Sequence, residues 1–136
     1  MNRLIGIQSY ASVSSLGINK NEIYHAYFNN KETYIKKSPF SNDWAATISK
    51  KSEHTLNELI RKNPKYRRLD RSTQLSILAA DQLDSNILKE NVGVNIGSSR
   101  GATNTLENAH KEFLTSGIPP FLSSPLTTMG NIATNV

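Results

Sequence analysis

The chain has 136 residues, of which 37% are hydrophobic and 20% are charged, and its formal net charge is +5. This length and composition are typical of one soluble domain with enough residues for a core. The absence of cysteine excludes disulfides, thiolate metal sites and a cysteine nucleophile within these residues. No apolar run approaches the ~20 residues of a membrane helix, and the N-terminus lacks the apolar core of a secretory signal, so we expect a cytoplasmic protein. The positive charge suits an acidic partner, although a solvated surface rich in Lys and Asn has the same composition.

Two elements are expected in the first thirty residues. The apolar residues at positions 4–7 predict a short strand, and small and polar residues after it predict a loop that closes at Gly17. Asn19 and Glu22 have the spacing of an N-cap and its third helical residue, which predicts a helix over 19–30. The apolar side chains on one face of this helix, which we expect to be buried, are Ile23, Tyr24, Tyr27 and Phe28.

The next segment, residues 31–50, shows no sustained hydrophobic period. It contains Pro39 and a run of Ser, Asn and Asp, so we expect a long loop or irregular insert. A helix is predicted over 52–63, because the residue before a proline disfavours helical backbone and Pro64 follows.

The strongest helical pattern covers residues 72–88. Asp70 or Ser72 can cap its start. Apolar residues occur nearly all round it, which is typical of a buried helix. The residues that share its main apolar face are Leu75, Leu78, Ala79 and Leu83, and Ile77 and Ala80 widen that face.

A strand is predicted at Val92–Ile96, and a helix over 102–115 with Gly117 as its C-terminal stop. A last segment, 126–136, begins a further helix. Alternating strands and helices indicate a layered α/β fold. The expected apolar face of the helix over 102–115 comprises Leu106, Ala109, Phe113 and Leu114.

The turn between that strand and that helix contains closely spaced glycines. A glycine turn that opens a helix can hold a phosphate. The glycines here are Gly93, Gly97 and Gly101, which is neither G-x-G-x-x-G nor a Walker A loop. We therefore expect no nucleotide at this turn.

Four segments, in this order, resemble the N-terminal part of a β-ketoacyl synthase, a condensing enzyme of the thiolase-like superfamily. Such enzymes begin with a strand and loop, continue with a helix preceded by basic residues and a Met/Leu-Asp pair, then a strand with a small-residue turn, then a P-x-T…N-x-A segment. The matching segments are RLIGIQSYASVSSLG, YRRLDRSTQLSILAADQL, GVNIGSSRGATNTLENAH and PLTTMGNIAT.

The resemblance implies a thiolase-like layered α/β/α fold, of which residues 1–136 would be the N-terminal portion. It also implies decarboxylative Claisen condensation of an acyl thioester with malonyl-acyl carrier protein, without a cofactor or metal. The family's nucleophilic Cys and its two catalytic His follow the matched segments, so they are expected beyond Val136 and no catalytic residue is expected in this chain. The implied partners are acyl carrier protein and a second ketosynthase-like subunit, in a homodimer or heterodimer.

The resemblance also assigns two sets of site residues. Basic residues before the Met/Leu-Asp pair help to dock the carrier, and the candidates here are Lys65, Arg67, Arg68 and Arg71. Candidates for the acyl pocket or subunit interface are Arg100, Gly101, Thr127, Thr128 and Asn131. Arg100 replaces a residue that is usually small or aliphatic, and the spacing from Pro125 to Asn131 is one residue longer than in commoner members. Both departures indicate a divergent branch.

The remaining polar residues offer weaker candidates for a site. His25, His54 and His110 lie on three separate predicted helices without a carboxylate at ligand spacing, so no metal site is expected. Four serines are interpreted as turn residues because none has the flanks of a nucleophile elbow: Ser14, Ser15, Ser98 and Ser99. The basic cluster can also be an ordinary solvated helix end; its residues are Arg61, Lys62, Lys65, Arg67, Arg68 and Arg71. Only Tyr66 lies among its charges, so nucleic acid is not expected.

Three functional hypotheses therefore stay open. The first is the N-terminal portion of an active ketosynthase. The second is a ketosynthase-like subunit without a nucleophile, of the chain-length-factor kind, in a fatty acid or polyketide system. The third is an unrelated binding module.

Overall fold

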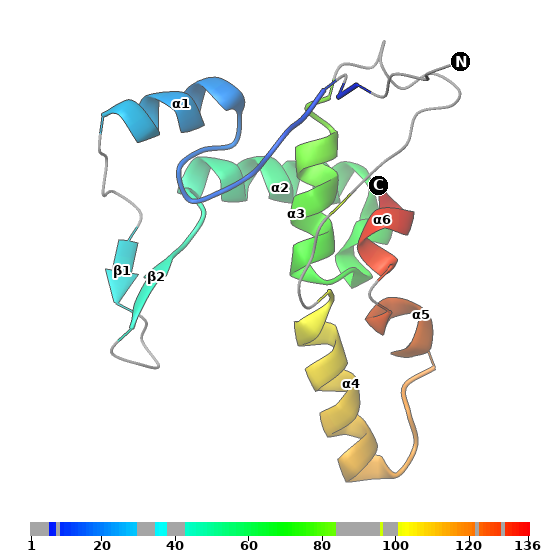
Figure 1. Cartoon of the computed structure of the whole chain (residues 1–136). Helices are drawn as coiled ribbons and strands as arrows, with labels where there is room; N and C mark the ends of the chain where they lie inside the picture. Colours follow the sequence, from blue (N-terminus) through cyan, green and yellow to red (C-terminus); the bar gives the residue numbers. More distant parts are fainter. Residues whose placement is uncertain are drawn as a thin grey trace.

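The computed structural model describes most of the chain, and the described part is mostly helical (Figure 1). The described residues are 6–7, 9–29, 35–37, 43–83, 96, 101–121, 123–128 and 130–136. The elements, in chain order, are α1 (Lys20–Phe28), β1 (Ile35–Lys37), β2 (Trp44–Ala46), α2 (Lys50–Lys62), the 3-10 helix η1 (Pro64–Arg68), α3 (Arg71–Ala80), α4 (Thr103–Ser116), α5 (Ser123–Thr127) and α6 (Asn131–Asn135).

The first two helices begin at side-chain caps. The Asn19 side chain accepts a hydrogen bond from the N–H of Glu22 at 3.0 Å, as the sequence predicts. Ser49 caps α2 by accepting from the N–H of Ser52 at 3.0 Å. α2 ends at Lys62, and its C-cap Asn63 directly precedes the proline that begins η1, so this predicted helix is also confirmed. Such caps satisfy N–H groups that have no partner inside the helix.

The segment expected to be a loop contains a short hairpin instead. β1 and β2 pair antiparallel, with Ile35 opposite Ala46 and Lys37 opposite Trp44. The expectation of irregular structure throughout 31–50 was therefore wrong for these residues. Strands of three residues are too short to produce the period-2 pattern by which a strand is read from sequence.

The core of the described residues lies where the segment before α1 meets α2 and α3. Ile18, Leu56 and Leu78 form its buried centre, and Leu56 and Leu78 are 0% and 2% exposed. The partly buried residues packed around this centre are Val13, Leu59, Ile60 and Leu75.

α3 contributes to the core, as predicted, and Asp70 is its N-cap, but the helix covers only Arg71–Ala80. The expectation of a helix over 72–88 was wrong at 81–83, where the chain turns, and residues 84–88 lie outside the described residues. Its buried residues are Thr73, Ile77 and Leu78, whereas Leu75, Ala79 and Leu83 are partly buried.

Two apolar faces that were expected to be buried are exposed. In α1 only Ala26 is buried, whereas Tyr24, Tyr27 and Phe28 are 60–71% exposed. In α4 no residue is buried, and Leu106, Phe113 and Leu114 are exposed. The helices themselves and the Gly117 stop, with its φ of 72°, are confirmed. A hydrophobic period predicts which face of a helix can be covered, but it does not supply the element that covers it.

The layered α/β/α arrangement is not seen in the described residues. The predicted strands at 4–7 and 92–96 lie mostly outside them; Ile7 and Ile96, which are described, are not in strands. Within the described part, the strands are those of the β1–β2 hairpin. Figure 1 shows α1 and this hairpin toward one end of α2, and α3 to α6 toward the other. Among the described helices, none has the length and apolarity needed to cross a membrane.

Candidate functional site

The predicted docking residues lie on and beside η1, between α2 and α3. Lys65, Arg67 and Arg68 are all exposed. The short helix is fixed to α3, because the Gln74 side-chain amide donates to the carbonyl of Tyr66 at 2.9 Å. The cations are therefore held on an anchored turn.

Ion pairs divide the basic cluster into two groups. Arg61 pairs with Glu58 at 2.7 Å, and Arg71 pairs with Glu53 on α2. Arg71, one of the predicted docking residues, thus has its charge matched within the chain. The described residues provide no carboxylate partner for Lys65, Arg67 or Arg68. Lys65 instead places its Nζ 5.2 Å from the centre of the Tyr66 ring.

Asp70, which follows Arg68 and Leu69 in the chain, is a buried carboxylate with four donors. One oxygen of Asp70 accepts from the N–H and hydroxyl of Ser72, at 2.8 and 2.7 Å. The other oxygen accepts from the N–H and hydroxyl of Thr105, at 3.0 and 3.1 Å. Burial alone would raise the pKa of Asp70, but the hydrogen bonds from Ser72 and Thr105 outweigh burial and lower it below the ordinary 3.8. Asp70 is therefore held as a carboxylate.

Gly101, the last glycine of the predicted turn, is attached to the same place. Gly101 is buried and has a φ of 64°, a left-handed conformation that favours glycine. Its carbonyl accepts from the Ser72 hydroxyl at 3.3 Å and from the N–H of Thr103 at 3.0 Å. Arg100, the neighbouring candidate, lies outside the described residues.

One of the C-terminal candidates, Asn131, contacts α3 at Thr73, the residue after Ser72. The buried Asn131 accepts from the hydroxyl of the fully buried Thr73 at 3.4 Å and donates to the carbonyl of Pro125 at 2.8 Å. Thr128 is exposed, with its hydroxyl 3.4 Å from the same carbonyl, and Thr127 is partly buried. Gly101 and Asn131 are therefore each hydrogen-bonded to the first turn of α3, Gly101 through Ser72 and Asn131 through Thr73.

Sequence reasoning identified Asp70 only as a possible cap and missed Thr73 and Thr105. The partners of these residues lie 35 and 58 positions apart in the chain, so no local pattern marks them. The histidines are exposed on α1, α2 and α4. Among the described residues, no group of three His, Cys, Asp or Glu could hold a metal.

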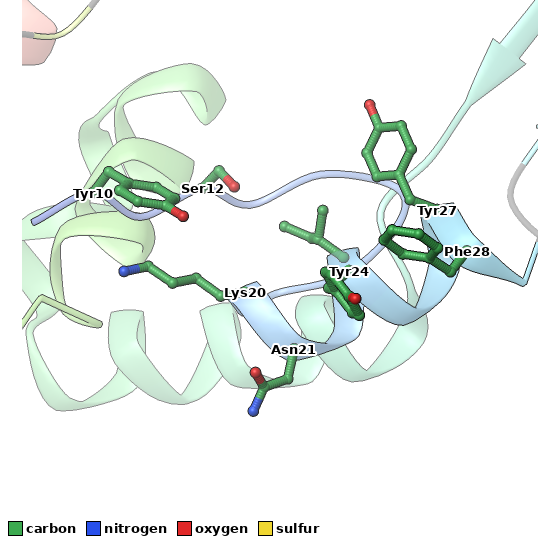
Figure 2. A pocket seen from close by; sticks show the side chains of 8 residues that line it. Tyr10, Ser12, Lys20, Asn21, Tyr24, Tyr27 and Phe28 are labelled. Carbon is green, nitrogen blue, oxygen red and sulfur yellow. The ribbon is translucent and has the colours of Figure 1, made fainter.

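A hollow of about 380 Å³ that is open to solvent lies elsewhere, along α1 (Figure 2). Figure 2 shows Tyr10 and Lys20 at one end and Tyr24, Tyr27 and Phe28 at the other. The Nζ of Lys20 lies 4.0 Å from the centre of the Tyr10 ring. None of its lining residues belongs to the docking cluster or to the glycine turn.

Comparison with known proteins adds no assignment. No family model matches the chain, and no curated protein matches it.

Proposed function

We propose that this chain is the N-terminal part of a divergent β-ketoacyl synthase and that it supplies the docking surface for an acyl carrier protein. Two things support the proposal. One is the order of the four sequence segments that resemble the family. The other is the group of three exposed cations directly before the Leu69–Asp70 pair.

The observation that carries the proposal is the state of Lys65, Arg67 and Arg68. They are exposed and close in sequence, and the described residues offer them no carboxylate. Like charges held together repel one another, so an acidic partner that approaches them gains a favourable interaction and a faster encounter. An acyl carrier protein is acidic and fits that requirement.

In the complete enzyme that the family implies, the condensation and the docking of the carrier are carried out by different parts of the protein. A Cys thiolate takes the acyl group from the carrier, a malonyl unit loses CO₂, and the carbanion that results attacks the acyl-enzyme. This chain contains no cysteine. Its part is to bind the carrier at η1 and to form one wall of the acyl site through the turn at Gly101 and the segment at Asn131.

A titration of the chain with acyl carrier protein tests the docking role. Arg67→Glu with Arg68→Glu removes two positive charges and adds two negative ones. We expect at least about a tenfold loss of affinity at ~0.01 M salt, where charges interact over ~30 Å, and a smaller loss at 1 M salt, where the range is ~3 Å.

The matched control is Lys50→Glu with Lys111→Glu, which changes the net charge equally at exposed positions on α2 and α4. This control should bind the carrier with a smaller loss than the Arg67 and Arg68 variant. Equal affinities of the wild-type chain and the Arg67 and Arg68 variant at low salt would contradict the proposal.

A further inference from the structure

One carboxylate serves the N-termini of two helices. Asp70 is the N-cap of α3 and accepts from Ser72. Its other oxygen accepts from the N–H of Thr105, the third residue of α4. The N-cap position of α4 is Ala102, whose side chain has no acceptor. Asp70 therefore performs for α4 the task that a local Ser, Thr, Asp or Asn performs in most helices.

The two oxygens of Asp70 are not equivalent for an amide. Both oxygens of a carboxylate accept hydrogen bonds, whereas an amide has one accepting oxygen and one NH₂ group that only donates. Asn is about as good an N-cap as Asp, so an amide can keep the contacts with Ser72. Its NH₂ group would then face the N–H of Thr105, which can only donate, although the Thr105 hydroxyl can turn to accept. The contact with the N–H of Thr105 specifically requires the carboxylate.

The same network holds Gly101, the last glycine of the predicted turn. Ser72, which donates to Asp70, lies 3.3 Å through its hydroxyl from the carbonyl of Gly101. Gly101 and Ala102 are both buried and directly precede α4. Gly101 is thus attached to α3 directly through Ser72, and the helix that follows it is attached to α3 through the contact of Thr105 with Asp70.

We propose that Asp70 is a positioning residue, which joins the N-termini of α3 and α4 and thereby sets the position of the Gly101 turn against α3. That this turn borders an acyl pocket rests on the proposed function, but the joining of the two helices does not. In the complete enzyme, Asp70 would hold one wall of the pocket at a fixed place relative to the docking residues that precede it in the chain.

Site-resolved amide hydrogen exchange in the Asp70→Asn chain tests this proposal. The Thr105 amide should exchange roughly tenfold faster or more, because it loses a charge-assisted acceptor. The Ser72 amide should change by less than about threefold, because Asn still caps α3. A general loss of stability would accelerate both amides together, so the ratio of the two rates is the decisive quantity.

Two further variants control the result. Asp81→Asn makes the same change at the exposed C-cap of α3 and should leave both rates as they are. Thr105→Ala removes only the hydroxyl donor to Asp70, and the amide of residue 105 should then exchange a few times faster; this variant decides the matter if Asp70→Asn does not fold. Unchanged exchange at residue 105 in either variant would overturn the proposal.

Carrier titration of the Asp70→Asn chain separates this inference from the proposed function. The docking cations remain in that variant, so its affinity for the carrier should match that of the wild-type chain. Failure of both chains to bind the carrier would remove the proposed function but would leave the exchange result, and the joining of the helices, in place.

Discussion

The side chains around the first turn of α3 are buried or hydrogen-bonded within the chain, whereas the apolar side chains on the outer faces of α1 and α4 are exposed to solvent. Around α3, Leu78 and Thr73 are buried and Asp70 has four donors from two helices. On α1 and α4, rings and leucines point to solvent within the described part, although their spacing is that of a covered face. The comparison teaches that amphipathic spacing and tertiary cover are separate properties of a helix.

The largest expected effect comes from one substitution made in both regions. Leu56→Ala removes a fully buried side chain from the core, and we expect the free energy of unfolding to fall by about 3 kcal/mol. Leu114→Ala removes the same atoms from a residue that is 71% exposed, and the change should stay within about 0.5 kcal/mol. Urea denaturation of both variants measures the difference. Equal losses would show that the face of α4 is covered after all.

The next effect is the pH dependence that Asp70 confers. Its pKa in the folded chain lies below the ordinary 3.8, so its contribution to stability is fully present above that value and is lost as the pH falls through the folded pKa. Glu22 acts in the same direction, because the N–H of Ile18 first, and then Lys51, lower its pKa below 4.5. Asp70→Ala should cost about 1–3 kcal/mol near neutral pH and progressively less in acid.

Asp81→Ala is the control for this pH series, because Asp81 is exposed at the opposite end of α3. Its stability curve should run parallel to that of the wild-type chain across the acid range. If the difference between the Asp70→Ala chain and the wild-type chain were the same at every pH, the carboxylate charge would have no part in the network.

A smaller effect is expected at the end of α4. Gly117 has a φ of 72°, and an L-residue in this conformation costs about 1 kcal/mol, although no atom would obstruct a Cβ there. Gly117→Ala should therefore destabilise the chain by about that amount. Gly6→Ala, at an exposed glycine with open space around it, should change stability by less than about 0.5 kcal/mol. A thermal melt that ranked Gly6→Ala as the more harmful change would contradict the assigned end of the helix.

The features that the sequence predicted correctly are local ones. Asn19, Pro64 and Gly117 each mark a helix boundary by chemistry that acts within a few residues, and the structure has these boundaries where they were expected. The contacts of Asp70 with Thr105 and of Thr73 with Asn131 were not predictable, because each needs two distant segments to meet. The exposed faces of α1 and α4 were misjudged for the same reason. The sequence shows that Lys65, Arg67, Arg68 and Arg71 are close together, but only the structure shows that Arg71 is paired with Glu53.

The central claim is that η1, and not the aromatic hollow along α1, receives an acidic carrier protein. The most direct measurement is an NMR titration of the isotope-labelled chain with acyl carrier protein at low salt, followed at every assigned amide. The account predicts that shift changes concentrate at Lys65, Arg67 and Arg68 and weaken as salt is added. Changes confined to Tyr24, Tyr27 and Phe28, or no change at any amide, would contradict it.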